Sequence, residues 1–224
     1  MKYLQPDWPA PDHIKAYTTL RQAASTPEQI AASLPLPETP IWIKQVHGAT
    51  VVDAEQTNAP QEADAIFTSQ PNRVCAILTA DCLPLLVCNR QGTQVAAIHA
   101  GWRGLAAGII EATFKALKQP ADEWLVWLGP AIGPQKFEVG KEVYDAFVSQ
   151  NEDARAAFTP QTQGKWLANL YQLARLRLHR QGVQAIYGGN FCTYTETNLF
   201  YSYRRDHGKT GRMVSLIWNC SPKR

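Results

Sequence analysis

The sequence predicts a single α/β domain in which a mixed β-sheet sandwich is covered by helices. Its 224 residues, 45% of them hydrophobic, are enough to bury one sizeable core. Short segments rich in valine and isoleucine crowd the first hundred residues, and amphipathic segments alternate with strands after them. Because no internal repeat, low-complexity linker or run of like charge divides the chain, we expect residues 1–224 to form one domain.

The expected strands are short apolar segments bounded by Gly, Asn, Asp or Pro. Six of them precede the first helix: residues 41–46, 50–52, 63–67, 74–79, 83–88 and 94–98. Two more follow, at residues 124–128 and 213–218. This order, strands first and then helices mixed with strands, favours a mixed sheet over regular βαβ winding.

The expected helices have apolar residues at three-to-four spacing. They are residues 104–118, 141–149 and 166–180. The first begins its apolar stripe at Leu105 and is stopped by Pro120. The third has Trp166 on its apolar side and is stopped by Gly182.

Composition excludes several classes of function. The formal net charge is only +3, so the chain is a poor candidate for binding nucleic acid or a membrane surface. The charge is uneven, however, because the segment from Tyr203 onward carries +5 and the preceding part −2. No apolar run approaches the ~20 residues that span a bilayer, and the N-terminus does not resemble a secretory signal. We therefore expect a cytoplasmic protein, in which five cysteines serve as free thiols or ligands rather than disulfides.

His47, Cys82 and His99 each stand where a predicted strand ends. Two imidazoles and a thiolate can hold a catalytic Zn²⁺ and leave its fourth position open. Their spacing matches no zinc-finger pattern, so a buried cysteine and two hydrogen-bonded histidines explain it as well. A third interpretation is a Cys82 nucleophile with His99 as base and Asp81 or His47 as the group that orients it.

Two loops have residues suited to anions. His99-Ala-Gly-Trp-Arg-Gly104 opens a predicted helix, and Arg103 beside exposed backbone N–H groups would suit a phosphate or carboxylate. The alternative is a plain strand-to-helix turn in which glycine permits positive φ. Residues 200–212 interleave aromatic residues with arginines, which fits either a site that stacks a base and holds an anion or a solvated hairpin.

Six motifs occur in order within residues 41–218. They are Gln-Val-His-Gly (45–48), Ala-Asp-Cys-Leu-Pro (80–84), Ile-His-Ala-Gly-Trp-Arg-Gly (98–104), Gly-Pro-Ala-Ile-Gly (129–133), Phe-Tyr-Ser-Tyr-Arg-Arg-Asp (200–206) and Thr-Gly-Arg-Met (210–213). Together, and in this order, they resemble one known family, the laccase-domain or YfiH-type family. Its members also carry the names polyphenol oxidase, purine nucleoside phosphorylase and peptidoglycan editing factor.

This resemblance implies an α/β sandwich of the YfiH/CNF-like type and a zinc ion bound by His47, Cys82 and His99. Copper could use the same ligands, but a multicopper oxidase needs a further cluster built chiefly from imidazoles. The chain has only five histidines, and the other three occur in unrelated contexts. Composition therefore argues against a laccase mechanism and favours zinc.

The resemblance further implies a purine nucleoside phosphorylase with adenosine deaminase activity, acting on adenosine, inosine and S-methyl-5′-thioadenosine. The expected catalytic residues are Cys82, His99, Asp81 and Arg103, of which Asp81 would shuttle a proton or orient a ligand. Arg103 and Arg205 would bind the anion. The partners would be a nucleoside and phosphate, without nucleic acid or membrane, and the protein a monomer or homodimer. The alternatives are a zinc-dependent amidase that trims a UDP-muramoyl amino-acid precursor of the cell wall, and a structural zinc protein.

Overall fold

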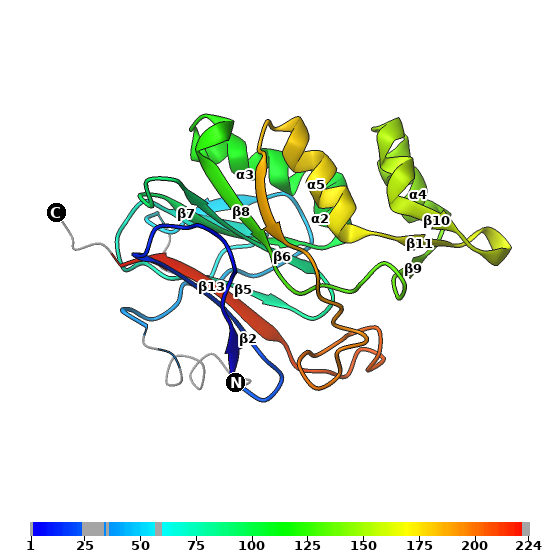
Figure 1. Cartoon of the computed structure of the whole chain (residues 1–224), viewed down its shortest axis with the longest axis horizontal. Helices are drawn as coiled ribbons and strands as arrows, with labels where there is room; N and C mark the ends of the chain where they lie inside the picture. The colour runs from blue at the N-terminus through cyan, green and yellow to red at the C-terminus, as the bar shows by residue number, and fades with distance from the viewer. Residues whose placement is uncertain (1, 24–33, 35, 57–59, 221–224) are drawn as a thin grey trace.

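The chain folds into three layers, a layer of helices, a six-stranded sheet and a four-stranded sheet (Figure 1). The computed structural model describes residues 2–23, 34, 36–56 and 60–220. In Figure 1 the helices lie on one face of the larger sheet, and the smaller sheet lies against its other face. The predicted sandwich of mixed sheets is therefore confirmed, and helices cover the outer face of the larger sheet.

The six-stranded sheet forms the middle layer. Its strand order is β12-β8-β6-β7-β4-β3, with β3 (Val51–Asp53), β4 (Ala65–Thr68), β6 (Leu83–Asn89), β7 (Val95–Ala100), β8 (Trp124–Leu128) and β12 (Ala185–Gly188). The central pairs are antiparallel, and the pairs at both edges are parallel. Every residue of β6, β7 and β8 is buried, because both faces of these strands are covered.

The four-stranded sheet is antiparallel and joins the two ends of the chain. Its order is β1-β2-β13-β5, with β1 (Tyr3–Leu4), β2 (Ile14–Thr19), β5 (Cys75–Thr79) and β13 (Met213–Asn219). Cys75, Ile77 and Ile217 share a buried cluster with Ile66 and Leu86 of the larger sheet. This cluster is the apolar core between the two sheets.

The helices pack a second core against the outer face of the larger sheet. Leu105, Ile109, Phe114 and Leu173 belong to this core, which also includes Val126 of β8. The helices are α2 (Trp102–Ala107), α3 (Ile109–Leu117), α4 (Lys141–Val148) and α5 (Leu170–Arg180). No helix within the described ranges is long and apolar enough to cross a membrane.

Small elements complete the part of the chain around α4. A three-stranded sheet has the order β10-β11-β9 and consists of β9 (Glu138–Val139), β10 (Phe158–Pro160) and β11 (Trp166–Ala168). Short 3₁₀ helices are η1 (Ala121–Glu123), η2 (Glu152–Ala157) and η3 (Thr162–Gly164). Tyr144 of α4 stacks on Trp166 of β11 with ring centroids 4.7 Å apart, which ties the helix to this sheet.

Two predicted helices and one predicted strand were wrong in part. Residues 104–118 form two helices rather than one, because Gly108 adopts a left-handed conformation (φ 91°) and ends α2 where α3 begins. The segment 166–180 starts as strand β11, and its helix begins only after Asn169, whose side chain accepts a hydrogen bond from the N–H of Gln172. Residues 41–46 make two isolated bridges instead of a strand.

Other segments differ from the sequence prediction in ways that follow from their surroundings. Strands β1, β2, β9, β10 and β12 were not predicted, because they are short or carry many polar residues. Residues 189–212, all of them described, contain no helix or strand, so the hairpin interpretation of residues 200–212 was wrong. This long irregular segment leads directly into β13 and borders the cavity described below.

The break at Gly108 gives a stability prediction. We expect Gly108→Ala to lower the free energy of unfolding by about 1–2 kcal/mol, because alanine is strained at a positive φ. A Cβ at this position would lie 3.5 Å from the Glu111 carboxylate, an ordinary contact, so the loss comes from the backbone. Gly108→Asn should lose less, since asparagine tolerates this conformation. Urea denaturation would measure both, and equal losses for the two variants would contradict the backbone explanation.

Candidate metal centre and cavity

Cys82 and His99 are brought together by two adjacent strands. Cys82 directly precedes β6, and His99 lies in β7, where it pairs with Pro84 in antiparallel register. Side chains at such neighbouring positions on adjacent strands come close to one another. His47 reaches them from the loop that precedes β3. The three residues that the sequence singled out therefore do meet at one place, although the strand expected before His47 is absent.

Three donor atoms converge there. The ligand atoms of His47, Cys82 and His99 all lie within 4.8 Å of one another, and the Cys82 Sγ is 3.9 Å from the His47 Nε2. The two imidazole rings meet edge to face with centroids 4.8 Å apart. Within the described residues this is the one group of three or more His, Cys, Asp or Glu side chains that could hold a metal ion. Two imidazole nitrogens and a thiolate are suitable donors for zinc.

Asp64 is the residue that fixes this group, and the sequence prediction missed it. Its carboxylate is fully buried and accepts a hydrogen bond of 2.7 Å from the His99 Nδ1, which leaves the Nε2 for a metal. It also accepts hydrogen bonds from the backbone N–H groups of His47 (2.9 Å) and Gly48 (2.6 Å). These bonds hold His47 in a left-handed conformation (φ 60°) that a non-glycine residue rarely adopts.

Hydrogen bonds within the donor group shift the pKa values of its members. Burial raises the pKa of the Cys82 thiol, but hydrogen bonds from His47 and His99 outweigh it and lower that pKa to about 6. Burial lowers the pKa of His99, and its bonds to Asp64 and Cys82 reverse this and raise it to about 9. The pKa of Asp64 is lowered: burial raises it, but the hydrogen bonds from His99 and the Gly48 N–H prevail. The lowered pKa favours the thiolate form of Cys82, which is the form that binds a metal, whereas the His99 ring must give up a proton before its Nε2 can bind one.

Two glycines allow the backbone to pack closely around the donor group of His47, Cys82 and His99. A Cβ on Gly101 would lie 3.0 Å from the Cys82 Sγ and 3.2 Å from the His47 Cδ2. A Cβ on Gly104 would lie 2.9 Å from the Gly48 carbonyl oxygen. Neither glycine has a positive φ, so close packing and not backbone conformation requires them. Helix α2 has only six residues, which leaves little helix dipole to bind an anion at its start.

The donor group stands in the wall of a cavity of about 570 Å³. Its lining combines apolar and aromatic side chains with three arginines, each of which lies over an aromatic ring. The three pairs are Arg103 on Trp102, Arg204 on Phe137 and Arg212 on Tyr203. The remaining lining residues are Ile43, Gln45, His47, Leu78, Thr79, Ala80, Asp81, Cys82, His99 and Ile132. Within the described ranges, none of the three arginines forms a salt bridge with a carboxylate.

Asp81 lines the same cavity, but its carboxylate is engaged elsewhere. One oxygen accepts a hydrogen bond of 2.6 Å from the Thr193 hydroxyl. The other accepts from the Ser202 hydroxyl (3.1 Å) and the Arg204 backbone N–H (2.7 Å). Asp81 therefore anchors the irregular segment 189–212 directly beside Cys82 of the donor group.

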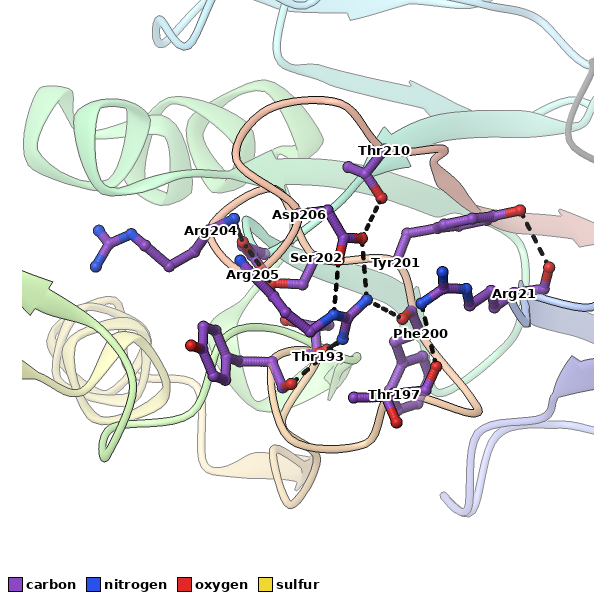
Figure 2. Close-up of polar contacts among 12 residues, drawn as sticks. Arg21, Thr193, Thr197, Phe200, Tyr201, Ser202, Arg204, Arg205, Asp206 and Thr210 are labelled. Atoms are coloured by element: carbon purple, nitrogen blue, oxygen red, sulfur yellow. Dashed lines mark hydrogen bonds and ion pairs between the residues drawn. The ribbon is translucent and has the colours of Figure 1, made fainter.

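Arg205 is not among the residues that line the cavity, although its neighbour Arg204 is. Its guanidinium pairs with the Asp206 carboxylate at 2.8 and 3.1 Å. It also donates to the carbonyl oxygens of Thr193, Tyr194 and Phe200. Figure 2 shows these bonds converging on Arg205 from the surrounding loop, while the Arg204 side chain points away. Arg205 thus joins the parts of segment 189–212 to one another, and its donors are used by the protein itself.

This contact pattern makes Arg205 a stability residue. We expect Arg205→Ala to lower the free energy of unfolding by about 2–4 kcal/mol, because three carbonyls and one carboxylate lose a charged donor. Lys209→Ala is the matched control: Lys209 is an exposed cation in the same segment, and its loss should cost less than about 0.5 kcal/mol. Equal stability of the two variants in urea would contradict this role.

Comparison with known proteins places the chain in a family. The model of a family described as multi-copper polyphenol oxidoreductase laccase matches residues 21–220. A purine nucleoside phosphorylase of Pseudomonas aeruginosa is 48% identical, over 96% of this chain and 98% of that protein. Purine nucleoside phosphorylase YfiH of Escherichia coli is 44% identical, over 97% of this chain and 98% of that protein.

Solved structures agree with these relatives. The crystal structure of a Neisseria meningitidis protein has a TM-score of 0.90 at 42% identity and covers 99% of this chain and 100% of that one. YlmD from Geobacillus stearothermophilus has a TM-score of 0.86 at 25% identity and covers 99% of this chain and 97% of that one. The fold, the motifs and the family model lead to the same conclusion: the chain belongs to the family described as multi-copper polyphenol oxidoreductase laccase, the YfiH-type family that its motifs indicate.

Proposed function

We propose that this protein is a zinc-dependent purine nucleoside phosphorylase that also deaminates adenosine. Its proposed substrates are adenosine, inosine and S-methyl-5′-thioadenosine, with phosphate as the second substrate. The observation that carries the proposal is the convergence of His47, Cys82 and His99 in the wall of a cavity lined by three arginines. Relatives named purine nucleoside phosphorylase support the same class of reaction. The free state of all five cysteines is consistent with a cytoplasmic setting.

Zinc is proposed over copper on the strength of the available side chains. A blue-copper site commonly adds a weak axial methionine, whereas Met213 is fully buried and its sulfur accepts the Tyr201 N–H. A multicopper oxidase needs further imidazoles, whereas His13 bonds to the Gly92 carbonyl and His179 to the Val183 carbonyl. When bound, zinc would supply a Lewis acid that polarises water or phosphate.

The protein's own residues would orient that chemistry. Asp64 holds His99 with its Nε2 toward the donor group and fixes the loop of His47. Arg103 is exposed in the cavity and would bind phosphate as it attacks the anomeric carbon of the ribose. Asp81 is a positioning residue in this proposal, because both its oxygens hold segment 189–212 beside Cys82. Arg205 is no longer proposed as an anion-binding residue, since its donors are engaged.

The number of protein donors distinguishes a catalytic zinc site from the alternative, a structural zinc site. Structural zinc sites almost always have four protein ligands, whereas catalytic sites keep one position open. Within the described part of the chain, the group offers three donors, and a cavity adjoins them. This arrangement favours a catalytic site.

The reaction can be tested directly with zinc-loaded protein. With phosphate present, we expect adenosine to give adenine and ribose 1-phosphate, and without phosphate we expect it to give inosine. Chromatography of the products measures both reactions. Cys82→Ala should abolish both together with zinc binding, because one of three ligands is lost.

The same assay separates the alternatives. Activity that survives chelation but is lost on alkylation of Cys82 would indicate a cysteine nucleophile instead of a metal site. Release of an amino acid from a UDP-muramoyl substrate, without turnover of nucleosides, would favour the amidase. Failure of zinc-loaded protein to convert any nucleoside would refute the proposal.

The role of Asp64 gives an independent prediction on metal affinity. We expect Asp64→Asn to weaken zinc binding about 10- to 100-fold, because the amide orients His99 less well and carries no charge. Competition with a chromophoric chelator measures this affinity. Glu62→Gln is the matched control: this acid lies two residues upstream and pairs with Lys44 at the surface, so zinc affinity should not change. An Asp64→Asn protein that binds zinc like the wild type would contradict the role.

A further inference from the structure

Tyr203 is the most exposed of the large apolar or aromatic side chains that the structure describes as exposed. It is 55% accessible and lies in the lining of the cavity that holds the donor group. Its hydroxyl makes no hydrogen bond to any other described residue. An exposed aromatic ring contributes little to folding, because most of its apolar surface stays in water. Its place at the cavity therefore needs another explanation.

The ring is exposed but held in place. A Cβ on Gly208 would lie 3.3 Å from the Tyr203 ring and hydroxyl, and the Gly208 N–H donates to the Tyr203 carbonyl at 2.9 Å. Gly208 has a φ of 85°, so the backbone turns back against the ring at a residue that suits this conformation. The two residues flanking Tyr203, Ser202 and Arg204, both donate to the Asp81 carboxylate. The chain on both sides of Tyr203 is thus anchored to Asp81, the residue that precedes Cys82.

Arg212 completes the arrangement. Its guanidinium lies over the Tyr203 ring, 5.9 Å from the centroid, and donates to the carbonyl oxygens of Thr210 and Gly211. A guanidinium fixed over a tyrosine ring combines two flat surfaces that attract aromatic ligands. Both side chains line the cavity. An aromatic ring that is fixed before a ligand arrives loses little conformational entropy on binding.

We propose that Tyr203 and Arg212 form a stacking platform for the planar heterocyclic base of the substrate. The inference rests on the proposed function, because it assigns the base of the proposed nucleoside substrate to this wall of the cavity. Stacking does not depend on the pattern of hydrogen-bonding groups. The platform therefore binds planar nucleoside bases in general, and other lining residues select among them.

Binding of 2-aminopurine riboside to the zinc-loaded protein tests the platform without catalysis. Stacking should quench the fluorescence of this base in the wild-type protein. Tyr203→Ala should weaken binding about 5- to 100-fold, since loss of one aromatic platform has an effect of this size on single bases. Tyr203→Phe should bind within about twofold of the wild type, because it keeps the ring. In turnover of adenosine, Tyr203→Ala should raise KM more than it lowers kcat.

Controls separate this role from a structural one. Tyr3→Ala removes another exposed tyrosine, which packs on Tyr17 of the four-stranded sheet, and should leave the binding of the probe unchanged. Zinc content of the Tyr203 variants should equal that of the wild type. Adenosine and uridine should displace the probe, whereas ribose should not. If the wild-type protein converts adenosine but Tyr203→Ala binds the probe as tightly as the wild type does, the platform is overturned and the proposed function stands. If the wild-type protein neither bound the probe nor converted adenosine, both the platform and the proposed function would be overturned.

Discussion

The donor group depends on one buried carboxylate, that of Asp64. The carboxylate is completely withdrawn from water, which is costly unless it is paired and hydrogen-bonded. The protein satisfies it with the imidazole of His99 and with the backbone of the loop at His47 and Gly48. A single carboxylate therefore sets the ring orientation of His99 and the backbone position of His47. The left-handed backbone at His47 persists because these bonds hold it.

A second carboxylate, that of Asp81, fixes the cavity wall by accepting hydrogen bonds, just as the carboxylate of Asp64 fixes the donor group. Segment 189–212 has no helix or strand to satisfy its backbone, so its polar groups need other partners. Asp81 accepts hydrogen bonds from residues 193, 202 and 204, and Arg205 donates to the carbonyls of residues 193, 194 and 200. An irregular segment held this way can present Tyr203, Arg204 and Arg212 at fixed positions. The two anchors meet at Thr193, whose hydroxyl donates to Asp81 and whose carbonyl oxygen accepts from Arg205.

The sequence singled out the three donors because each follows or ends a predicted strand, but only the family resemblance assigned them together to a metal. It did not predict Asp64, because one acid at the start of an apolar segment has no partner within sequence reach, and His99 lies 35 residues away. Nor could it distinguish Arg204 from Arg205: both are arginines in one irregular segment, and only tertiary contacts direct one into the cavity and the other into the loop. The single helix expected over residues 104–118 failed for a local reason, since periodicity continues across Gly108 although the backbone does not.

The placement of β13 also determines when the site can form during synthesis. In the four-stranded sheet β13 lies between β2 and β5, so neither of these strands has its central partner until residues 213–219 are available. Contacts between segments so distant in sequence form slowly, because the intervening chain must first be ordered. Segment 189–212 precedes β13 immediately, and so the wall that carries Tyr203 closes among the last parts of the molecule. A chain that stalls before β13 would already contain His47, Cys82 and His99. It would lack the strand that follows segment 189–212 and joins β2 to β5.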